Sequence, residues 1–245
     1  MKEKEVKGFV KKRYGKIAKS GASCCSSSES LVEQAKLVGY SEEDVRSVPE
    51  ESNMGLGCGN PVALAALKEG ETVLDLGSGG GIDVFLASKK VGPKGKVIGV
   101  DMTKKMIERS NQTAEKYGYN NVEFRLGEIE DLPVEDNSID AIVSNCVINL
   151  SPNKKKVFKE AYRVLKPKGR MLISDLVTEG KLPSKIRKNL DAWAACIAGA
   201  MDKKEYLVTI EEAGFKKVNI VSESSYELDV SKDLKGKITS IKVEA

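Results

Sequence analysis

Short apolar runs alternate with amphipathic segments along the chain from residue 72 onward. The apolar runs are bounded by turn residues and predict strands. These strands are expected at 72–76, 96–101, Val122–Arg125, Ile139–Asn145 and Arg170–Leu176. Apolar residues at helical spacing predict helices between them at Ile82–Val91, 103–117 and 153–166. This alternation predicts a parallel sheet with helices on both faces.

The segments on either side of this alternation differ from it. An apolar stripe at helical spacing predicts an amphipathic helix over Met1–Ile17. Three short helices are expected next, at Leu31–Val38, Glu42–Val48 and Val62–Leu67, with Ser30, Ser41 and Asn60 as their N-caps. The tail predicts helices at Leu182–Ala200 and Lys203–Glu212 and strands at Val218–Glu223 and Ile238–Val243. The last two strands predict an antiparallel hairpin at the end of the sheet.

One glycine-rich stretch, Val73–Asp83, joins the first predicted strand to its helix. It reads VLDLGSGGGID, and glycine there tolerates a positive φ and lets a ligand approach the backbone. The helix that follows points free N–H groups at the same place. By itself such a turn can also close an ordinary strand–helix connection. The next strand ends in Asp101, where an acid about twenty residues beyond the glycines can accept both hydroxyls of a ribose.

The glycine-rich turn together with Asp101 resembles the S-adenosylmethionine-dependent methyltransferases of the Rossmann-like class. It fits the dinucleotide fingerprint poorly, because Ile82 stands where the third glycine would be. A P-loop is excluded, because no Gly-Lys-Ser or Gly-Lys-Thr follows. Since ligands of such sheets bind beyond the carboxyl ends of the strands, Asp101, Cys146 and the glycines are expected at one edge.

Composition limits the class of protein, its partners and its location. The chain has 245 residues, of which 40% are hydrophobic and 31% charged, and these values predict a soluble globular protein with one main domain and an appendage. A formal charge of +4 does not imply nucleic acid as a partner. The sequence has neither an apolar run of membrane-spanning length nor the apolar core of a signal peptide, so no membrane partner and a cytoplasmic location are expected.

Histidine is absent, which excludes Ser-His and Cys-His catalysis. The cysteines show no CxxC pair, so a zinc ribbon is disfavoured, and in a reducing cytoplasm free thiols are expected. Taken one at a time, each is best interpreted as a small buried hydrophobe. They stand at Cys24, Cys25, Cys58, Cys146 and Cys196.

Three cysteine motifs, LGCGNP, SNCVINLS and AACIAGA, resemble those of the arsenite methyltransferases, and the similarity runs from about Glu51 to Phe215. The resemblance implies that Cys58, Cys146 and Cys196 bind trivalent arsenic and are the catalytic residues. The family also has an N-terminal cysteine that takes part in arsenic uptake or disulfide exchange. Cys24 and Cys25 both remain candidates for it.

The resemblance also implies a fold and a cofactor. The fold is a Rossmann-like α/β methyltransferase domain over 56–245, with a mainly parallel seven-stranded sheet and an antiparallel C-terminal hairpin. Residues 1–55 form a helical segment that acts as a lid or an arsenic-uptake region. The implied S-adenosylmethionine site has Asp75, Gly77, Ser78, Gly79, Gly81 and Asn145 at the methionine end, Asp101 at the ribose, and Met102, Ile129 and Glu130 at the adenine. Core packing is the competing interpretation for Met102 and Ile129.

The function expected from the resemblance is methyl transfer from S-adenosylmethionine to trivalent arsenic. Three soft thiolates suit this soft centre and leave its lone pair free to attack the methyl group without a protein base. Arsenite or its thiol conjugates are the expected substrates, and thioredoxin or glutathione would restore the thiols. Two alternatives remain open. A methyltransferase for carbon or oxygen of a small molecule explains the glycine turn but not the cysteines, and a non-enzymatic metalloid-binding protein leaves the cofactor site unexplained.

Overall fold

The computed structural model describes residues 2–20, 31–225 and 237–245, so the predictions for Cys24, Cys25 and Ser30 lie outside the described residues. Its centre is one sheet with the strand order β3-β2-β1-β4-β5-β8-β7, and the two-residue strand β6 pairs with β5. The strands are β1 (Thr72–Leu76), β2 (Lys96–Asp101), β3 (Val122–Leu126), β4 (Ile139–Asn145), β5 (Leu165–Thr178), β6 (Met201–Asp202), β7 (Asn219–Ser225) and β8 (Ile238–Glu244).

Strands β3, β2, β1, β4 and β5 are parallel, whereas β8 runs antiparallel to β5 and β7 antiparallel to β8. The predicted mainly parallel sheet with an antiparallel C-terminal hairpin is confirmed, but the described residues form eight strands rather than the predicted seven, because the short β6 also pairs with β5. Leu74 of β1 stands opposite Ile98 on one side and Ile142 on the other. The strand order reverses between β1 and β4, and ligands of such sheets bind at this switch point.

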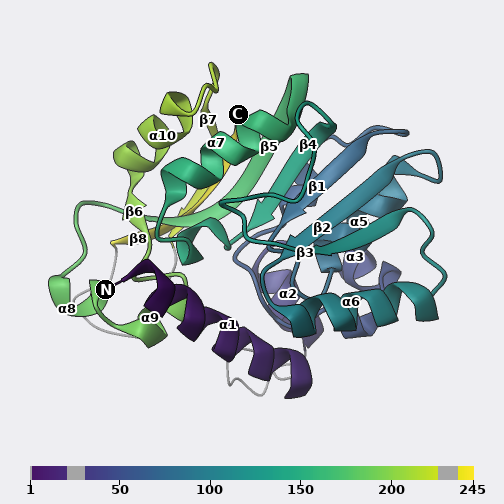
Figure 1. Ribbon diagram of the computed structural model, residues 1–245, viewed down its shortest axis with the longest axis horizontal. Coiled ribbons are helices and arrows are strands. Elements are labelled where there is room, and N and C mark those ends of the chain that lie inside the picture. Colours follow the sequence, from purple (N-terminus) through teal and green to yellow (C-terminus); the bar gives the residue numbers. More distant parts are fainter. Residues whose placement is uncertain (1, 21–30, 226–236) are drawn as a thin grey trace.

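Helices cover both faces of the sheet (Figure 1). Alternate residues of β1 point to opposite faces, because a strand has a side-chain period of two. Leu74 and Leu76 pack in the core with α7 and α10, and Val73 packs in the core with α5 and α6. These helices are α5 (Ile82–Val91), α6 (Lys104–Lys116), α7 (Lys154–Val164) and α10 (Lys203–Glu212).

The N-terminal part is helical, as the sequence predicts. Helix α1 (Glu3–Ser20) passes between α9 (Leu190–Ala194) and α6 at the carboxyl ends of the parallel strands (Figure 1). Further short helices are α2 (Leu31–Leu37), α3 (Glu42–Ser47), η1 (Glu50–Ser52), α4 (Pro61–Leu64) and η2 (Ile148–Leu150). Ser41 and Asn60 cap α3 and α4 through their side chains, which confirms two predicted N-caps.

The prediction of one helix over Leu182–Ala200 is wrong. The segment contains α8 (Ser184–Arg187) and α9 (Leu190–Ala194), and Asn189 starts the second by accepting a 2.9 Å hydrogen bond from Ala192 N. Cys196 then takes a left-handed conformation with φ 62°, which ends the helical path. A side chain at Gly199 would collide with the carbonyl oxygen of Asn149, so the backbone passes close to η2. None of the described helices is long and apolar enough to cross a membrane.

Candidate functional site

A cavity of about 310 Å³ lies at the switch point of the sheet. It is lined by the carboxyl ends of β1, β2 and β4, by α1 and by the segment after α9. Nine of the ten predicted cofactor residues line it: Asp75, Gly77, Ser78, Gly79, Asp101, Met102, Ile129, Glu130 and Asn145. The tenth, Gly81, is instead the N-cap of α5 at φ 94°, and a Cβ there would lie 2.9 Å from the rings of Phe85 and Phe124.

The glycine turn forms the floor of this cavity. Gly77 and Gly79 have φ values of 70° and 51°, a region that favours glycine. A side chain at Gly77 would collide with Val147, so the turn also packs tightly against the segment after β4. Asp101 is tied to the turn, because its Oδ2 accepts a 3.0 Å hydrogen bond from Gly79 N. Its Oδ1 accepts one of 2.7 Å from Thr103 N, which fixes the carboxylate at the end of β2.

Two buried carboxylates, Asp75 and Asp83, face the same cavity. Burial, reinforced by the charges of Asp83 and Asp101, raises the pKa of Asp75 well above its ordinary value. Burial also raises the pKa of Asp83 to about 6, although hydrogen bonds from Tyr40 and Asn145 oppose the shift. No lysine or arginine of the described ranges forms an ion pair with either acid. A cationic ligand would therefore stabilise both carboxylates in their ionised forms.

The side chain of Asn145 connects the cavity with the loop that carries Cys58. Its Oδ1 accepts a 2.9 Å hydrogen bond from Cys58 N, and its Nδ2 donates one of 2.6 Å to Gly59 O. Nδ2 also lies 2.8 Å from Tyr40 Oη and 3.2 Å from Asp83 Oδ2. Tyr40 and Asp83 were not predicted from the sequence, although Asp83 stands directly after the glycine turn, in the first turn of α5.

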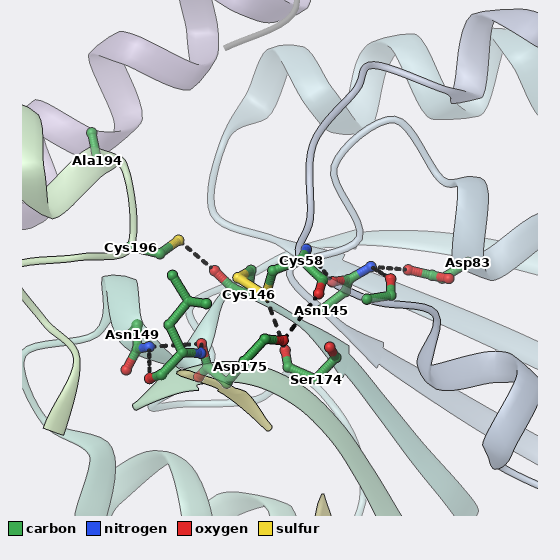
Figure 2. Close-up of a disulfide and its surroundings, with 12 residues drawn as sticks. Cys58, Asp83, Asn145, Cys146, Asn149, Ser174, Asp175, Ala194 and Cys196 are labelled. Atoms are coloured by element: carbon green, nitrogen blue, oxygen red, sulfur yellow. Dashed lines mark hydrogen bonds between the residues drawn. A yellow bond between two sulfur atoms is a disulfide. The ribbon is translucent and has the colours of Figure 1, made fainter. Parts of the chain in front are cut away.

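The three cysteines of the motifs come together beside this network (Figure 2). Cys58 and Cys146 form a disulfide with a Cα–Cα distance of 5.8 Å, and Cys196 is buried and lies outside this disulfide. The expectation of free thiols is therefore wrong for Cys58 and Cys146, whose Cα atoms are close enough to be bridged. The Cys196 Sγ donates a 2.7 Å hydrogen bond to the carbonyl oxygen of Cys146. Cys146 and Cys196 line the cavity, whereas Cys58 does not.

A buried polar cluster supports the cysteines from behind. Asp175 Oδ1 accepts hydrogen bonds from Asn149 Nδ2 at 2.7 Å and from Leu176 N at 2.9 Å, and its Oδ2 accepts one from Tyr206 Oη at 3.1 Å. Its carboxylate and the sulfur atoms of Cys58 and Cys146 all lie within 4.8 Å of one another. Burial raises the pKa of Asp175 to about 7. The sequence gives no local signal for this cluster, because tertiary packing assembles it.

Helix α1 closes one side of the cavity. Lys7 forms ion pairs of 2.9 Å with Glu128 and 3.0 Å with Glu130, both in the loop after β3. Tyr14 Oη donates a 3.2 Å hydrogen bond to Ala194 O, and Arg13 pairs with Asp191 at 3.0 Å. The helix thus joins the loop after β3 to α9 across the cavity.

The family model described as a methyltransferase domain matches residues 67–214, which contain the glycine turn, Asp101 and two of the three cysteines. The chain therefore contains a methyltransferase domain of the Rossmann-like class, a class that uses S-adenosylmethionine as its cofactor. The residues present suit this molecule, because glycine backbone and two buried carboxylates, Asp75 and Asp83, line the cavity, and these carboxylates would face a cationic methionine end. Asp101 lies where the ribose hydroxyls are expected.

Three similar proteins all belong to one kind of methyltransferase, which acts on arsenic. An arsenite methyltransferase of Halobacterium salinarum is 43% identical over 98% of this chain and 66% of its own length. The human arsenite methyltransferase is 38% identical over 88% of this chain and 59% of its own. The crystal structure of an arsenic(III) S-adenosylmethionine methyltransferase from Chlamydomonas reinhardtii superimposes with a TM-score of 0.70 at 34% identity, covering 89% of this chain and 74% of that one.

The chain belongs to the arsenite methyltransferase family. It spans about two thirds or less of the length of the curated relatives that it matches, between 59% and 66% for the first five.

Proposed function

We propose that this protein transfers methyl groups from S-adenosylmethionine to trivalent arsenic held by Cys58, Cys146 and Cys196. The observation that carries the proposal is the meeting of these three cysteines beside the cofactor cavity, although they come from segments far apart in the sequence. Thiolates are soft ligands and suit a soft centre such as trivalent arsenic. Detoxification of arsenite, or of its conjugates with small thiols, would be the outcome.

Substrate binding requires the reduced form of all three cysteines. Each thiol displaces one hydroxide from arsenite and gives up its proton to it as water, so three As–S bonds replace three As–O bonds. The disulfide between Cys58 and Cys146 must first gain two electrons and two protons. Cys196 is already a thiol, and it is held toward Cys146 by its hydrogen bond.

Alignment is the main contribution of the protein to the transfer step. S-adenosylmethionine supplies an electrophilic methyl group on a positively charged sulfur. Arsenic held by three thiolates keeps one lone pair, and this pair is the nucleophile. No protein base is needed, which suits a chain without histidine. Cys146 and Cys196 line the cavity with Asp75 and Asp83, so the arsenic would lie next to the methionine end.

The disulfide has a place in the same cycle. Methylation raises arsenic from the trivalent to the pentavalent state, and two electrons are needed to return it. Two cysteine thiolates can supply them by forming one disulfide, and Cys58 and Cys146 have the spacing for it. A thiol reductant such as thioredoxin or glutathione, available in the cytoplasm, then restores both thiols by exchange.

Residues 1–55 are proposed to act as a lid on the methyltransferase domain of residues 56–245. The support comes from α1, whose Lys7, Val10, Arg13 and Tyr14 line the cavity. Its ion pairs and its hydrogen bond to Ala194 O connect the loop after β3 with α9. Cys24 and Cys25 lie outside the described residues, and both stay candidates for arsenic uptake or disulfide exchange within this segment.

The test is direct. The purified chain is incubated with arsenite, S-adenosylmethionine and a dithiol reductant, and the arsenic species are separated by chromatography. Methylated arsenic is expected, and its formation should stop when the thiols are alkylated beforehand or when S-adenosylhomocysteine replaces the cofactor. Unchanged arsenite, with S-adenosylmethionine bound according to calorimetry, would favour a small-molecule acceptor. In that case thiol alkylation would leave methylation of the acceptor unaffected.

A further inference from the structure

The carboxamide of Asn145 acts as a clamp on the loop that carries Cys58. It accepts a hydrogen bond from Cys58 N and donates one to Gly59 O. The side chain thus satisfies the backbone groups of this stretch as a neighbouring strand would. The loop is seated closely, because a Cβ at Gly57 would lie 2.7 Å from Asn145 Nδ2. The position of Cys58 relative to Cys146 therefore depends on how this one amide is held.

The amide nitrogen of Asn145 has more acceptors than protons. Gly59 O lies at 2.6 Å, Tyr40 Oη at 2.8 Å and Asp83 Oδ2 at 3.2 Å, whereas an amide nitrogen donates only two protons. Gly59 O takes one, and Tyr40 and Asp83 compete for the other. Tyr40 Oη itself donates a 2.9 Å hydrogen bond to Asp83 Oδ1, which closes the network.

The two competing acceptors differ in their access to the cofactor. Asp83 lines the cavity, and in the described part of the chain no cationic side chain pairs with it. Tyr40 is buried between α2 and α3 and does not line the cavity. A cation in the cavity therefore acts on Asp83 directly, and it reaches Tyr40 and Cys58 only through hydrogen bonds.

We propose that Tyr40 and Asn145 are positioning residues that couple occupancy of the cofactor cavity to the order of the Cys58 loop. When the cationic methionine end of the cofactor lies against Asp83, this carboxylate competes less for the Asn145 proton. The proton then bonds to Tyr40 Oη, and the amide stays in the orientation that clamps Cys58. The coupling is reciprocal, so a well-ordered Cys58 loop also strengthens cofactor binding. This inference rests on the methyltransferase class and does not require arsenic as the substrate.

The experiment measures amide hydrogen exchange at Cys58 in the reduced full chain, with and without saturating S-adenosylmethionine. Cys58 N–H bonds directly to Asn145 Oδ1, so its exchange rate reports the clamp. We expect the cofactor to slow exchange at least about fivefold in the wild type, the lower end of typical coupling. In Tyr40→Phe, with saturation verified by calorimetry, the slowing should fall below about twofold because the hydroxyl that holds Asn145 is absent.

Tyr119→Phe is the matched control. Tyr119 packs against Phe85 in the same core as Tyr40, with ring centroids 4.6 Å apart, and its hydroxyl has no hydrogen bond to the described residues. This variant should keep the wild-type slowing. Equal slowing in Tyr40→Phe and the wild type would overturn the proposal, and so would unchanged exchange in the cofactor-bound wild type. Direct shielding by the cofactor would be the same in all saturated samples.

A second measurement needs only the wild type. The disulfide ties Cys58 to Cys146 and keeps its loop in the clamped position. The oxidised chain should therefore bind S-adenosylmethionine at least about fivefold more tightly than the reduced chain. Equal affinities of the two forms would contradict the coupling, whatever the outcome of the arsenic assays.

Discussion

The thiol of Cys196 donates a 2.7 Å hydrogen bond to the carbonyl oxygen of Cys146 across 50 residues of sequence. Both residues have left-handed backbone conformations, with φ values of 62° and 58°. Such conformations cost a residue other than glycine of order 1–3 kcal/mol and are concentrated at functional sites. The fold thus tolerates two unfavourable backbone conformations where Cys196 lies beside Cys146.

Replacement of any motif cysteine should lower the rate of arsenic methylation but leave cofactor binding intact. In Cys196→Ser the side chain keeps its size, but the soft ligand is lost. We expect arsenic methylation to fall on the order of a hundredfold, as for a misplaced reactant. With every sample reduced, so that the Cys58–Cys146 disulfide is open in the wild type as well, the affinity for S-adenosylhomocysteine should stay within about twofold of the wild type, because that ligand requires no arsenic. Full methylation activity in Cys58→Ser, Cys146→Ser and Cys196→Ser alike would contradict the three-cysteine site.

The glycine after Cys58 should be intolerant of a side chain. A Cβ at Gly59 would collide with Ser174 Oγ and lie 2.7 Å from Ser174 Cβ. Gly59→Ala should lower the free energy of unfolding by about 1–3 kcal/mol, as overpacked sites do, and Ser174→Gly in the same chain should recover part of the loss.

The matched control lies in α1. A Cβ at Gly8 would meet no atom within 4 Å, so Gly8→Ala should stabilise the helix by about 0.5–1 kcal/mol. Denaturant unfolding measures all these variants. If Gly59→Ala were as stable as Gly8→Ala, the close seating of the Cys58 loop would be refuted.

The sequence predicted the fold well where the pattern of apolar residues is unambiguous. The bounds expected for β1, β2, β4 and α5 agree with the structure, because these buried parallel strands are mainly apolar runs between clear turn residues. The helix expected over Leu182–Ala200 failed for the opposite reason. Small apolar residues there are compatible with a helix. The close approach of Gly199 to Asn149 and the left-handed conformation of Cys196 instead fix a non-helical course of the backbone.

Cofactor affinity should depend on pH through the acids of the cavity. Burial raises the pKa of Asp83 from its ordinary value of 3.8 to about 6. The folded apo chain therefore binds a proton that the unfolded chain lacks between these values. The contribution of Asp83 to the free energy of unfolding is therefore fully present below about pH 4. It is lost as pH rises through about 6.

The cofactor reverses this preference, because its cationic methionine end favours the ionised carboxylate. Its affinity should rise as pH rises through about 6, by about tenfold per pH unit below that value for one linked proton. Calorimetry between about pH 5 and 7.5 measures the change, and Asp83→Asn should make it less steep, since Asp75 in the same cavity still titrates. An equally steep profile in Asp83→Asn would assign the proton to another group.

Helix α1 should control the release of the cofactor. Lys7→Met removes the ion pairs to Glu128 and Glu130 but keeps a long side chain. The dissociation rate of S-adenosylhomocysteine should rise roughly threefold, since ion pairs near the surface contribute up to about 1 kcal/mol. A chase of labelled S-adenosylhomocysteine with excess unlabelled ligand measures the release. Lys12→Met on the exposed face of the same helix should leave the rate unchanged, and equal rates in both variants would argue against a lid.

The candidate site was only partly accessible from the sequence. Residues in local motifs, such as Gly77, Asp101 and Cys146, were found because the ends of parallel strands meet at one edge. Tyr40, Asp175 and Lys7 were missed, because each reaches the site through packing between distant segments that leaves no local pattern. The redox state of Cys58 and Cys146 was also missed, since the spacing of two Cα atoms is a tertiary property.

Arsenic K-edge X-ray absorption tests the central claim most directly. Cys24 and Cys25 are replaced by serine in every sample, so that Cys58, Cys146 and Cys196 are the remaining cysteines. The reduced chain loaded with one equivalent of arsenite should show three sulfur neighbours around arsenic. Cys196→Ser in the same background should show two sulfur neighbours and one oxygen. Fewer than three sulfur neighbours in the chain that keeps all three cysteines would contradict the proposed arsenic site.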